Sequence, residues 1–172
     1  MNNQVQAELK KIFNSRFSTS ESTRANYARG EDTYDPILSK AVVFPETNEE
    51  VSKILSLCNQ HKIPVVPFGT GTSLEGNVVG NEKGITISLE KMNKILNVNA
   101  EDFDCRVQAC VTKEQLNEYL REDGVFFPID PGANAAIGGM ASTSASGTMA
   151  VKYGTMTVSS THLRAHETAY HL

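Results

Sequence analysis

The sequence has few cysteines, no run of lysine or arginine, and no long hydrophobic stretch. Its formal net charge is −4, and without a basic stripe no nucleic-acid partner is expected. The three cysteines, Cys58, Cys105 and Cys110, form no CxxC pair. This argues against a disulfide framework or a zinc site and fits a reducing compartment. The apolar stretches are too short to span a bilayer, so no transmembrane segment is expected.

What is present suits one domain or a large fragment of a longer protein, since 40% of the 172 residues are hydrophobic. The N-terminus has no apolar signal core, and Glu8 argues against a transit peptide. Residues 1–40 are predicted to form a short helix followed by an irregular lead-in. The helix has an apolar face formed by Val5, Leu9, Ile12 and Phe13.

Short strands alternate with helices from residue 41 onward. Strands are predicted at residues 41–44, 64–68, 84–89, 95–99 and 105–111, and from Val125. Two helices begin at threonine N-caps, Thr47 and Thr112, and should end near His61 and at Gly124. Strand, helix and strand within residues 41–68 predict a βαβ unit with a parallel strand pair, so the class is α+β or α/β.

Apolar spacing assigns the cysteines to core or surface. The helix after Thr47 has one apolar face, so Cys58 is predicted to be a core residue and not a nucleophile. That face comprises Val51, Ile54, Leu55 and Cys58. Alternation along residues 105–111 predicts that Cys105 is buried and that Cys110 is partly exposed.

The first glycine-rich segment, FGTGTSLEG at residues 68–76, follows a predicted strand directly. Glycine permits positive φ and a close approach of the backbone to a ligand, and consecutive free N–H groups form an anion site. The spacing matches neither a P-loop nor the G-x-G-x-x-G dinucleotide motif. A pyrophosphate site and a plain glycine-rich connection are both consistent with this segment alone.

The second glycine-rich segment, DPGANAAIGGMASTSASGTMAVKYGTM, covers residues 130–156. Its small residues bury little apolar area by themselves, so the segment is predicted to wrap around a polar ligand. A flexible linker is the alternative. Larger residues spaced along the segment, which could anchor it, argue against a linker; they are Pro131, Ile137, Met140 and Tyr153. Two such segments suggest two walls of one long cofactor groove.

The motifs PFGTGTSLEG and DPGANAAIGGMASTSASGT resemble those of the FAD-linked oxidases of the vanillyl-alcohol oxidase type, which have a PCMH-type FAD-binding domain. The similarity is greatest to the D-lactate dehydrogenase (cytochrome) and glycolate oxidase D-subunit branch. It implies an α+β fold of two subdomains, the second incomplete here. The FAD-binding domain would cover residues 41–156, and residues 157–172 would form a tail that is not native to the family.

The resemblance also implies which residues bind FAD. The first segment would hold the pyrophosphate and the flavin side. The second would line the flavin, contact the ribose, pyrophosphate and ring, and close the groove. The implied residues are Phe68, Gly69, Thr70, Gly71, Thr72, Ser73, Gly76, Asp130, Pro131, Gly132, Ile137, Gly138, Gly139, Ala141, Thr143, Ser144, Gly147, Tyr153 and Gly154. Some relatives attach the flavin to a histidine in the first segment. This chain has none there, so non-covalent FAD is expected.

By the same resemblance, a D-2-hydroxy acid such as D-lactate would be oxidised to the 2-keto acid by hydride transfer to flavin N5. Electrons would pass to cytochrome c, a quinone or another acceptor. The protein would be cytoplasmic or membrane-associated in a bacterium and mitochondrial in a eukaryote. The family's catalytic and metal-binding residues belong to a substrate domain that is missing here, so none is assigned. A non-catalytic flavin- or nucleotide-binding module, or an inactive fragment, is the alternative.

The tail offers a competing metal hypothesis. His162 and His166 are four residues apart, with Glu167 and His171 nearby, a spacing that could ligate a metal on a helix. No H-E-x-x-H motif is present, and no apolar pattern would hold such a helix in place. A solvated terminus is therefore favoured, and no metal site is predicted.

Overall fold

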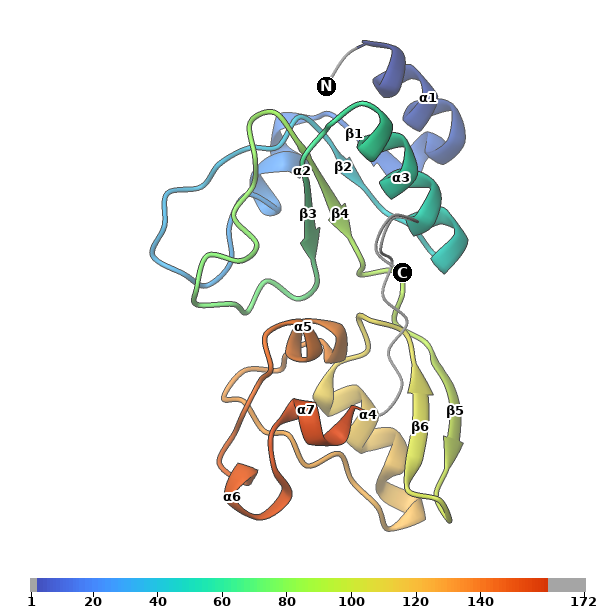
Figure 1. The fold of residues 1–172 in the computed structure, drawn as a ribbon, viewed down its shortest axis with the longest axis vertical. Coiled ribbons are helices and arrows are strands. Elements are labelled where there is room, and N and C mark those ends of the chain that lie inside the picture. Colours follow the sequence, from blue (N-terminus) through green and yellow to red (C-terminus); the bar gives the residue numbers. More distant parts are fainter. Residues whose placement is uncertain (1–2, 161–172) are drawn as a thin grey trace. The chain divides into compact units, whose positions relative to one another are not determined.

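The computed structural model describes residues 3–160, which form two compact units, residues 3–91 and residues 92–160. Both units combine helices with short strands, as Figure 1 shows, and the predicted α+β class is confirmed. None of the helices in the described range combines the length and apolar character that a membrane crossing requires.

The first unit is built on a four-stranded sheet in the order β1-β2-β4-β3. Its strands are β1 (Phe17–Ser18), β2 (Val42–Val43), β3 (Val65–Phe68) and β4 (Ile85–Ser88). β1 runs antiparallel to β2, whereas β2 and β3 both run parallel to β4. The predicted direct pairing of the strands at 41–44 and 64–68 is therefore wrong. β4 is buried at all four positions, which suits the centre, and Pro67 lacks a ladder donor, which suits the edge.

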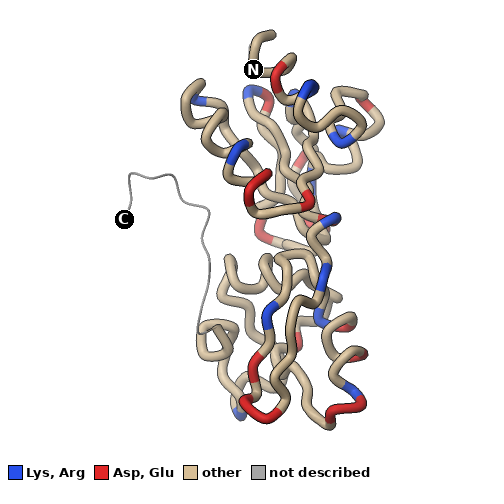
Figure 2. The backbone as a smooth tube through the Cα atoms, turned by 90° about the vertical axis from the view of Figure 1, so that its right-hand side faces the viewer, with Lys and Arg blue, Asp and Glu red and all other residues tan. Residues whose placement is uncertain are grey.

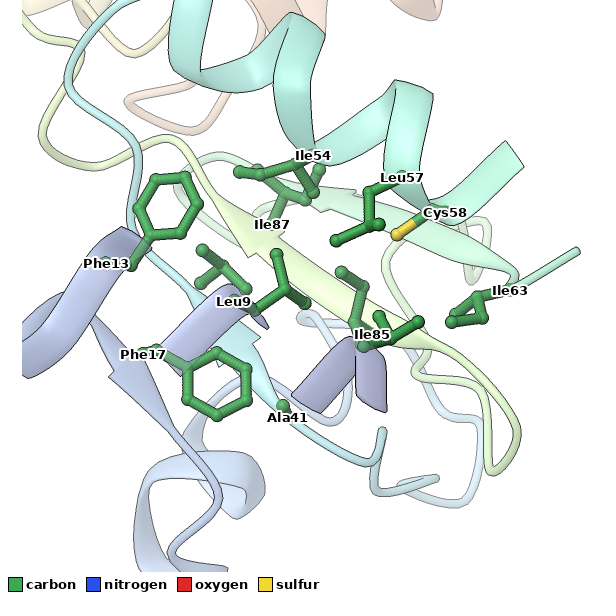
Figure 3. Packing of buried hydrophobic residues seen from close by; sticks show 12 residues of the cluster. Leu9, Phe13, Phe17, Ala41, Ile54, Leu57, Cys58, Ile63, Ile85 and Ile87 are labelled. Carbon is green, nitrogen blue, oxygen red and sulfur yellow. The ribbon is translucent and has the colours of Figure 1, made fainter. Parts of the chain in front are cut away.

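Helices α1 (Asn3–Phe13) and α3 (Asn48–Gln60) pack on the sheet and on each other. In Figure 3, Leu9 and Phe13 of α1 point toward Ile54 and Leu57 of α3 and toward Ile85 of β4. The core of the first unit consists of Val5, Leu9, Phe13, Phe17, Ala41, Val43, Ile54, Leu57, Cys58, Ile63, Ile85 and Ile87.

The sequence pattern identifies most of this core, with two exceptions. Ile12 was predicted to share the apolar face of α1 but is 43% exposed. On α3, Leu57 is buried, whereas the predicted Leu55 is only partly buried. The lead-in, predicted to be irregular, contains the 3-10 turn η1 (Asn14–Arg16), β1 and helix α2 (Glu21–Asn26).

An ion pair joins the lead-in to the start of α3. The Thr47 side chain accepts a hydrogen bond from the Glu50 N–H at 3.2 Å, as a helix N-cap. The Glu50 carboxylate accepts from both terminal nitrogens of Arg16 at 2.6 Å and from the Glu46 N–H at 2.7 Å. The Arg16 guanidinium also donates to the Phe44 carbonyl at 3.2 Å. Arg16 therefore ties β1, the end of β2 and α3 together.

Glu50→Gln is expected to make the free energy of unfolding less dependent on pH in the acid range. The hydrogen bonds from Arg16 lower the pKa of Glu50 from 4.5 to about 2. Because the folded-state pKa lies below the unfolded value, this stabilisation is complete above about pH 4.5 and is lost as the pH falls toward about 2. The carboxylate is 22% exposed, so solvent screening limits the effect to on the order of 2 kcal/mol.

Urea unfolding across this pH window measures the effect. The exposed carboxylate of Glu8 on α1 provides the control variant Glu8→Gln. The wild type and Glu8→Gln should lose stability in parallel on acidification, and Glu50→Gln should lose less. Identical pH dependence in all three chains would contradict a stabilising role for this ion pair.

The second unit contains an antiparallel hairpin and five helical segments. Strands β5 (Ile95–Asn99) and β6 (Asp104–Val107) pair with an irregularity between Ile95 and Asn97. The helical segments are α4 (Lys113–Leu120), the 3-10 turn η2 (Arg121–Asp123), α5 (Ile137–Ser142), α6 (Ala150–Tyr153) and α7 (Met156–Ser159). Two small apolar clusters lie under these elements, one centred on Val111, Leu116 and Leu120 and one on Ile129, Met140 and Met156.

Three predictions for this unit are wrong. Cys105 is exposed and Cys110 is buried, the reverse of the expected pattern. The reason is that β6 ends at Val107, and the chain then turns so that the Cys110 N–H donates to the Met92 carbonyl at 2.8 Å. The strand predicted from Val125 does not form.

The side-chain amide of Asn117 on α4 makes the backbone hydrogen bonds that a neighbouring strand would otherwise make. The Asn117 Oδ1 accepts from the Phe127 N–H at 2.7 Å, and its Nδ2 donates to the Phe127 carbonyl at 3.2 Å. Both polar backbone groups of Phe127 are thereby satisfied by one side chain. Gly124 ends η2 with φ +69°. The segment after it forms no strand and is held by the Asn117 side chain.

Candidate functional site

The predicted cofactor-binding residues fall into both units. Phe68 to Gly76 belong to the first unit, and Asp130 to Gly154 belong to the second. Figure 2 shows blue and red segments mixed along both units. The stretch 68–80 contains one charged residue, Glu75, and the stretch 131–154 also contains one, Lys152. Neutral donors, and not charged side chains, therefore dominate both segments.

The first loop leaves the edge strand β3 at Phe68, which is 7% exposed. The Phe68 ring packs edge-on against Tyr27, with 5.0 Å between ring centroids. Two glycines then take left-handed backbone angles, with φ of +76° at Gly71 and +71° at Gly76. A Cβ on Gly71 would lie 2.8 Å from the Phe68 ring. Both the backbone angle and the space at this position therefore require glycine.

The backbone N–H groups of this loop are available to a ligand. Within the described range, no protein acceptor takes the N–H of Thr70, Gly71, Thr72 or Ser73. The Thr70 and Thr72 hydroxyls lie 3.4 Å apart. Consecutive unpaired N–H groups with neighbouring hydroxyls are suited to an anion such as a phosphate.

Part of the second segment is helical, although its glycines do not favour a helix. Helix α5 begins after Ala136 and contains both Gly138 and Gly139. The Gly138 N–H donates to the Ala109 carbonyl at 2.8 Å, and an added Cβ would lie 2.8 Å from that oxygen. Packing within the unit thus explains Gly138. It does not explain Gly139, which is exposed and where an added Cβ would meet no atom of the described residues within 4 Å beyond its own helix backbone.

Asp130 and Gly147 are brought together in the second unit. A Cβ on Gly147 would overlap the Asp130 carbonyl, so the two backbones are in contact. The Asp130 carboxylate accepts from the Lys113 Nζ at 2.6 Å and from the Thr148 hydroxyl at 3.3 Å. The hydrogen bond from Lys113 lowers the pKa of Asp130. The sequence analysis did not identify Lys113, because this first residue of α4 is not part of either glycine-rich motif.

The other predicted residues of this segment lie along α5 and the turns around it. Thr143 donates from its hydroxyl to the Gly139 carbonyl at 3.0 Å, and Ser144 has φ +50°. Tyr153 packs edge-on against Phe126 at 5.6 Å, and Gly154 has φ +84°. Four other predicted residues are half-buried or exposed: Pro131, Gly132, Ile137 and Ala141.

The remaining cysteines, histidines and carboxylates of the described residues include no cluster that could hold a metal ion. Burial raises the pKa of the Cys58 thiol to about 11, so it stays protonated in the core as predicted. Within residues 3–160, no group of three or more His, Cys, Asp or Glu is arranged to hold a metal ion. The histidines of the metal hypothesis, His162, His166 and His171, lie outside the described residues.

Comparisons with known proteins agree on one family. A family model described as an FAD binding domain matches residues 39–166. The chain is 46% identical over 139 residues to a probable mitochondrial D-lactate dehydrogenase of Danio rerio, which covers 81% of this chain and 28% of that protein. It is 40% identical over 152 residues to the mitochondrial D-lactate dehydrogenase (cytochrome) of Arabidopsis thaliana, covering 87% and 27%.

The fold is also found in solved structures. An alkyldihydroxyacetonephosphate synthase superposes with a TM-score of 0.82 at 23% sequence identity, covering 90% of this chain and 34% of that one. The chain thus spans between a quarter and a third of the length of these proteins.

Proposed function

We infer that this chain, which belongs to the FAD-binding domain family, holds its FAD non-covalently and forms the cofactor-binding part of an oxidoreductase acting on a D-2-hydroxy acid. The family assignment establishes FAD as the cofactor, in agreement with the sequence motifs. The residue roles, the substrate and the electron acceptor are the proposal.

Two features of the glycine-rich segments carry the proposal: unpaired backbone N–H groups in the first and an unexplained glycine in the second. In the first, four consecutive N–H groups from Thr70 to Ser73 have no acceptor in the described part of the unit. In the second, Gly139 sits in a helix, where glycine costs about 1 kcal/mol relative to alanine, and no contact among residues 3–160 requires it. A ligand that packs closely against the helix backbone at Gly139 would explain why this position has no side chain.

Each segment is assigned a part of the cofactor. Residues 68–76 donate backbone N–H groups to the pyrophosphate. The loop has no lysine or arginine, so its donors to this anion are neutral. Residues 130–147 contact the ribose, the pyrophosphate and the ring through backbone and small side chains. Lys113 holds Asp130 in place, and Tyr153 closes the segment against Phe126.

When bound, FAD would supply the hydride acceptor for oxidation of the hydroxy acid at C2, and the hydroxyl proton would pass to a base as the 2-keto acid forms. The chain's own residues bind and orient the cofactor. The names of the two relatives support D-lactate as substrate, cytochrome as acceptor and a mitochondrial location in a eukaryotic cell. Because the chain spans only about a quarter of those relatives, turnover is proposed for a longer protein that contains this segment.

Retention of flavin by the purified chain tests the proposal. After incubation with FAD and removal of free ligand, we expect a visible flavin absorption band to remain with the folded protein. Denaturation should release all of the flavin, which would exclude a covalent bond. A folded chain that retains no FAD would contradict cofactor binding by these two segments in this chain.

A further inference from the structure

Asp32 is a buried carboxylate that the proposed function does not use. It is 8% exposed in the segment between α2 and β2. Its Oδ2 accepts from the Gly30 N–H at 3.1 Å, and its Oδ1 accepts from the Tyr34 N–H at 3.0 Å. One side chain thus closes the backbone of residues 30–34 into a compact turn, and it occupies both carboxylate oxygens in doing so.

This turn lies directly against the first glycine-rich loop. Figure 1 shows the two connections side by side, and the contacts are between backbones. The Glu31 N–H donates to the Gly71 carbonyl at 2.9 Å. A Cβ on Gly30 would lie 2.6 Å from the Gly71 carbonyl oxygen and 2.9 Å from that of Ser73. The Tyr34 ring lies equally close to Gly76, where a Cβ would be 2.8 Å from it.

The contact at Gly71 fixes the direction of a ligand-binding donor. In a planar trans peptide, the carbonyl and the following N–H point in opposite directions, and no peptide bond in the described chain is cis. Because the Gly71 carbonyl is held toward Glu31, the Thr72 N–H points away from the turn. The turn therefore presents this N–H on the side of the loop that the protein leaves unpaired.

We propose that Asp32 is a positioning residue for FAD: its buried carboxylate shapes the turn that holds the Gly71 carbonyl and so aims the Thr72 N–H at the pyrophosphate. This rests on the proposed function of the loop. Asp32 touches no part of the cofactor. Its effect passes through Glu31, and it concerns the phosphate end of the ligand rather than the ring.

Asp32→Asn and Asp35→Asn form a matched pair of variants. Both remove one negative charge, but Asp35 is exposed, and an amide can accept only one of the two hydrogen bonds that Asp32 accepts. Dissociation constants are measured for FAD and for riboflavin, which lacks the pyrophosphate. Amide hydrogen exchange of Glu31 is measured in the flavin-free chains.

We expect Asp32→Asn to weaken FAD binding roughly fivefold, the factor that a loss of about 1 kcal/mol gives, with riboflavin binding unchanged and Glu31 exchange accelerated. Asp35→Asn should match the wild type in all three. Equal behaviour of the two variants, or an equal loss for FAD and riboflavin, would overturn the proposal while leaving the proposed function intact. A wild type that binds no FAD would instead contradict the proposed function, and the role of Asp32 with it.

Discussion

Gly139→Ala is expected to weaken FAD binding at least tenfold while leaving the chain as stable as the wild type or more so. Gly139 is in α5, where alanine is preferred over glycine by about 1 kcal/mol. In the part of the chain that the structure describes, the added Cβ would meet no atom within 4 Å beyond its own helix backbone. The fold therefore gains from the change. If FAD occupies this space, the methyl group displaces it, and a tenfold loss corresponds to about 1.4 kcal/mol.

The measurement is a flavin titration combined with thermal unfolding of the same samples. Gly138→Ala serves as the control, because its Cβ would lie 2.8 Å from both the Cβ and the carbonyl oxygen of Ala109. That variant should lose stability. A Gly139→Ala chain with unchanged FAD affinity would refute the placement of the cofactor against α5, whatever its stability.

Leu9→Ala is expected to lower the free energy of unfolding by about 3 kcal/mol, within the range for a large-to-small change in a packed core. Leu9 has no exposed surface and belongs to the cluster formed by α1, α3 and the sheet. Although α1 lies at the start of the chain, its buried side chains pack in the same cluster as those of the central strand β4. Removing the side chain leaves a cavity between layers that cannot move together without breaking the sheet contacts.

Ile12→Ala on the same helix is the matched control. It also removes aliphatic carbons from α1, but the side chain is 43% exposed, so its cost should stay below about 1 kcal/mol. Chemical denaturation of both variants measures the difference. Similar losses for Leu9→Ala and Ile12→Ala would contradict the packing of α1 in the core.

Local features of the fold could be predicted from the sequence because they depend on neighbouring residues. Thr47 and Thr112 were identified as N-caps, and both accept the expected hydrogen bond. The position of β4 between β2 and β3 could not, because parallel pairing joins residues far apart in the chain. Helix α5 was missed because its two adjacent glycines conceal the helical pattern.

The family and its PCMH-type FAD-binding fold were predicted from two motifs and are confirmed by the comparisons. The individual cofactor residues and the boundaries at 41 and 156 stay predictions. Asp32 was not identified as a candidate, because its role depends on a contact between segments forty residues apart. Its local signal, an aspartate two residues after Gly30 in a polar stretch, is typical of a turn and does not specify what the turn touches.

The central position of β4 has a consequence for synthesis of the chain on the ribosome. β1, β2, α3 and β3 all emerge before Ile85, yet β2 and β3 have no ladder with each other and are joined only through β4. A nascent chain that stops short of β4 carries two unpaired strand edges in parallel orientation and a half-covered core. Such edges are prone to pairing with other chains. The sheet of the first unit therefore closes only after Ser88 leaves the exit tunnel, and the nascent chain is most prone to aggregation before that point.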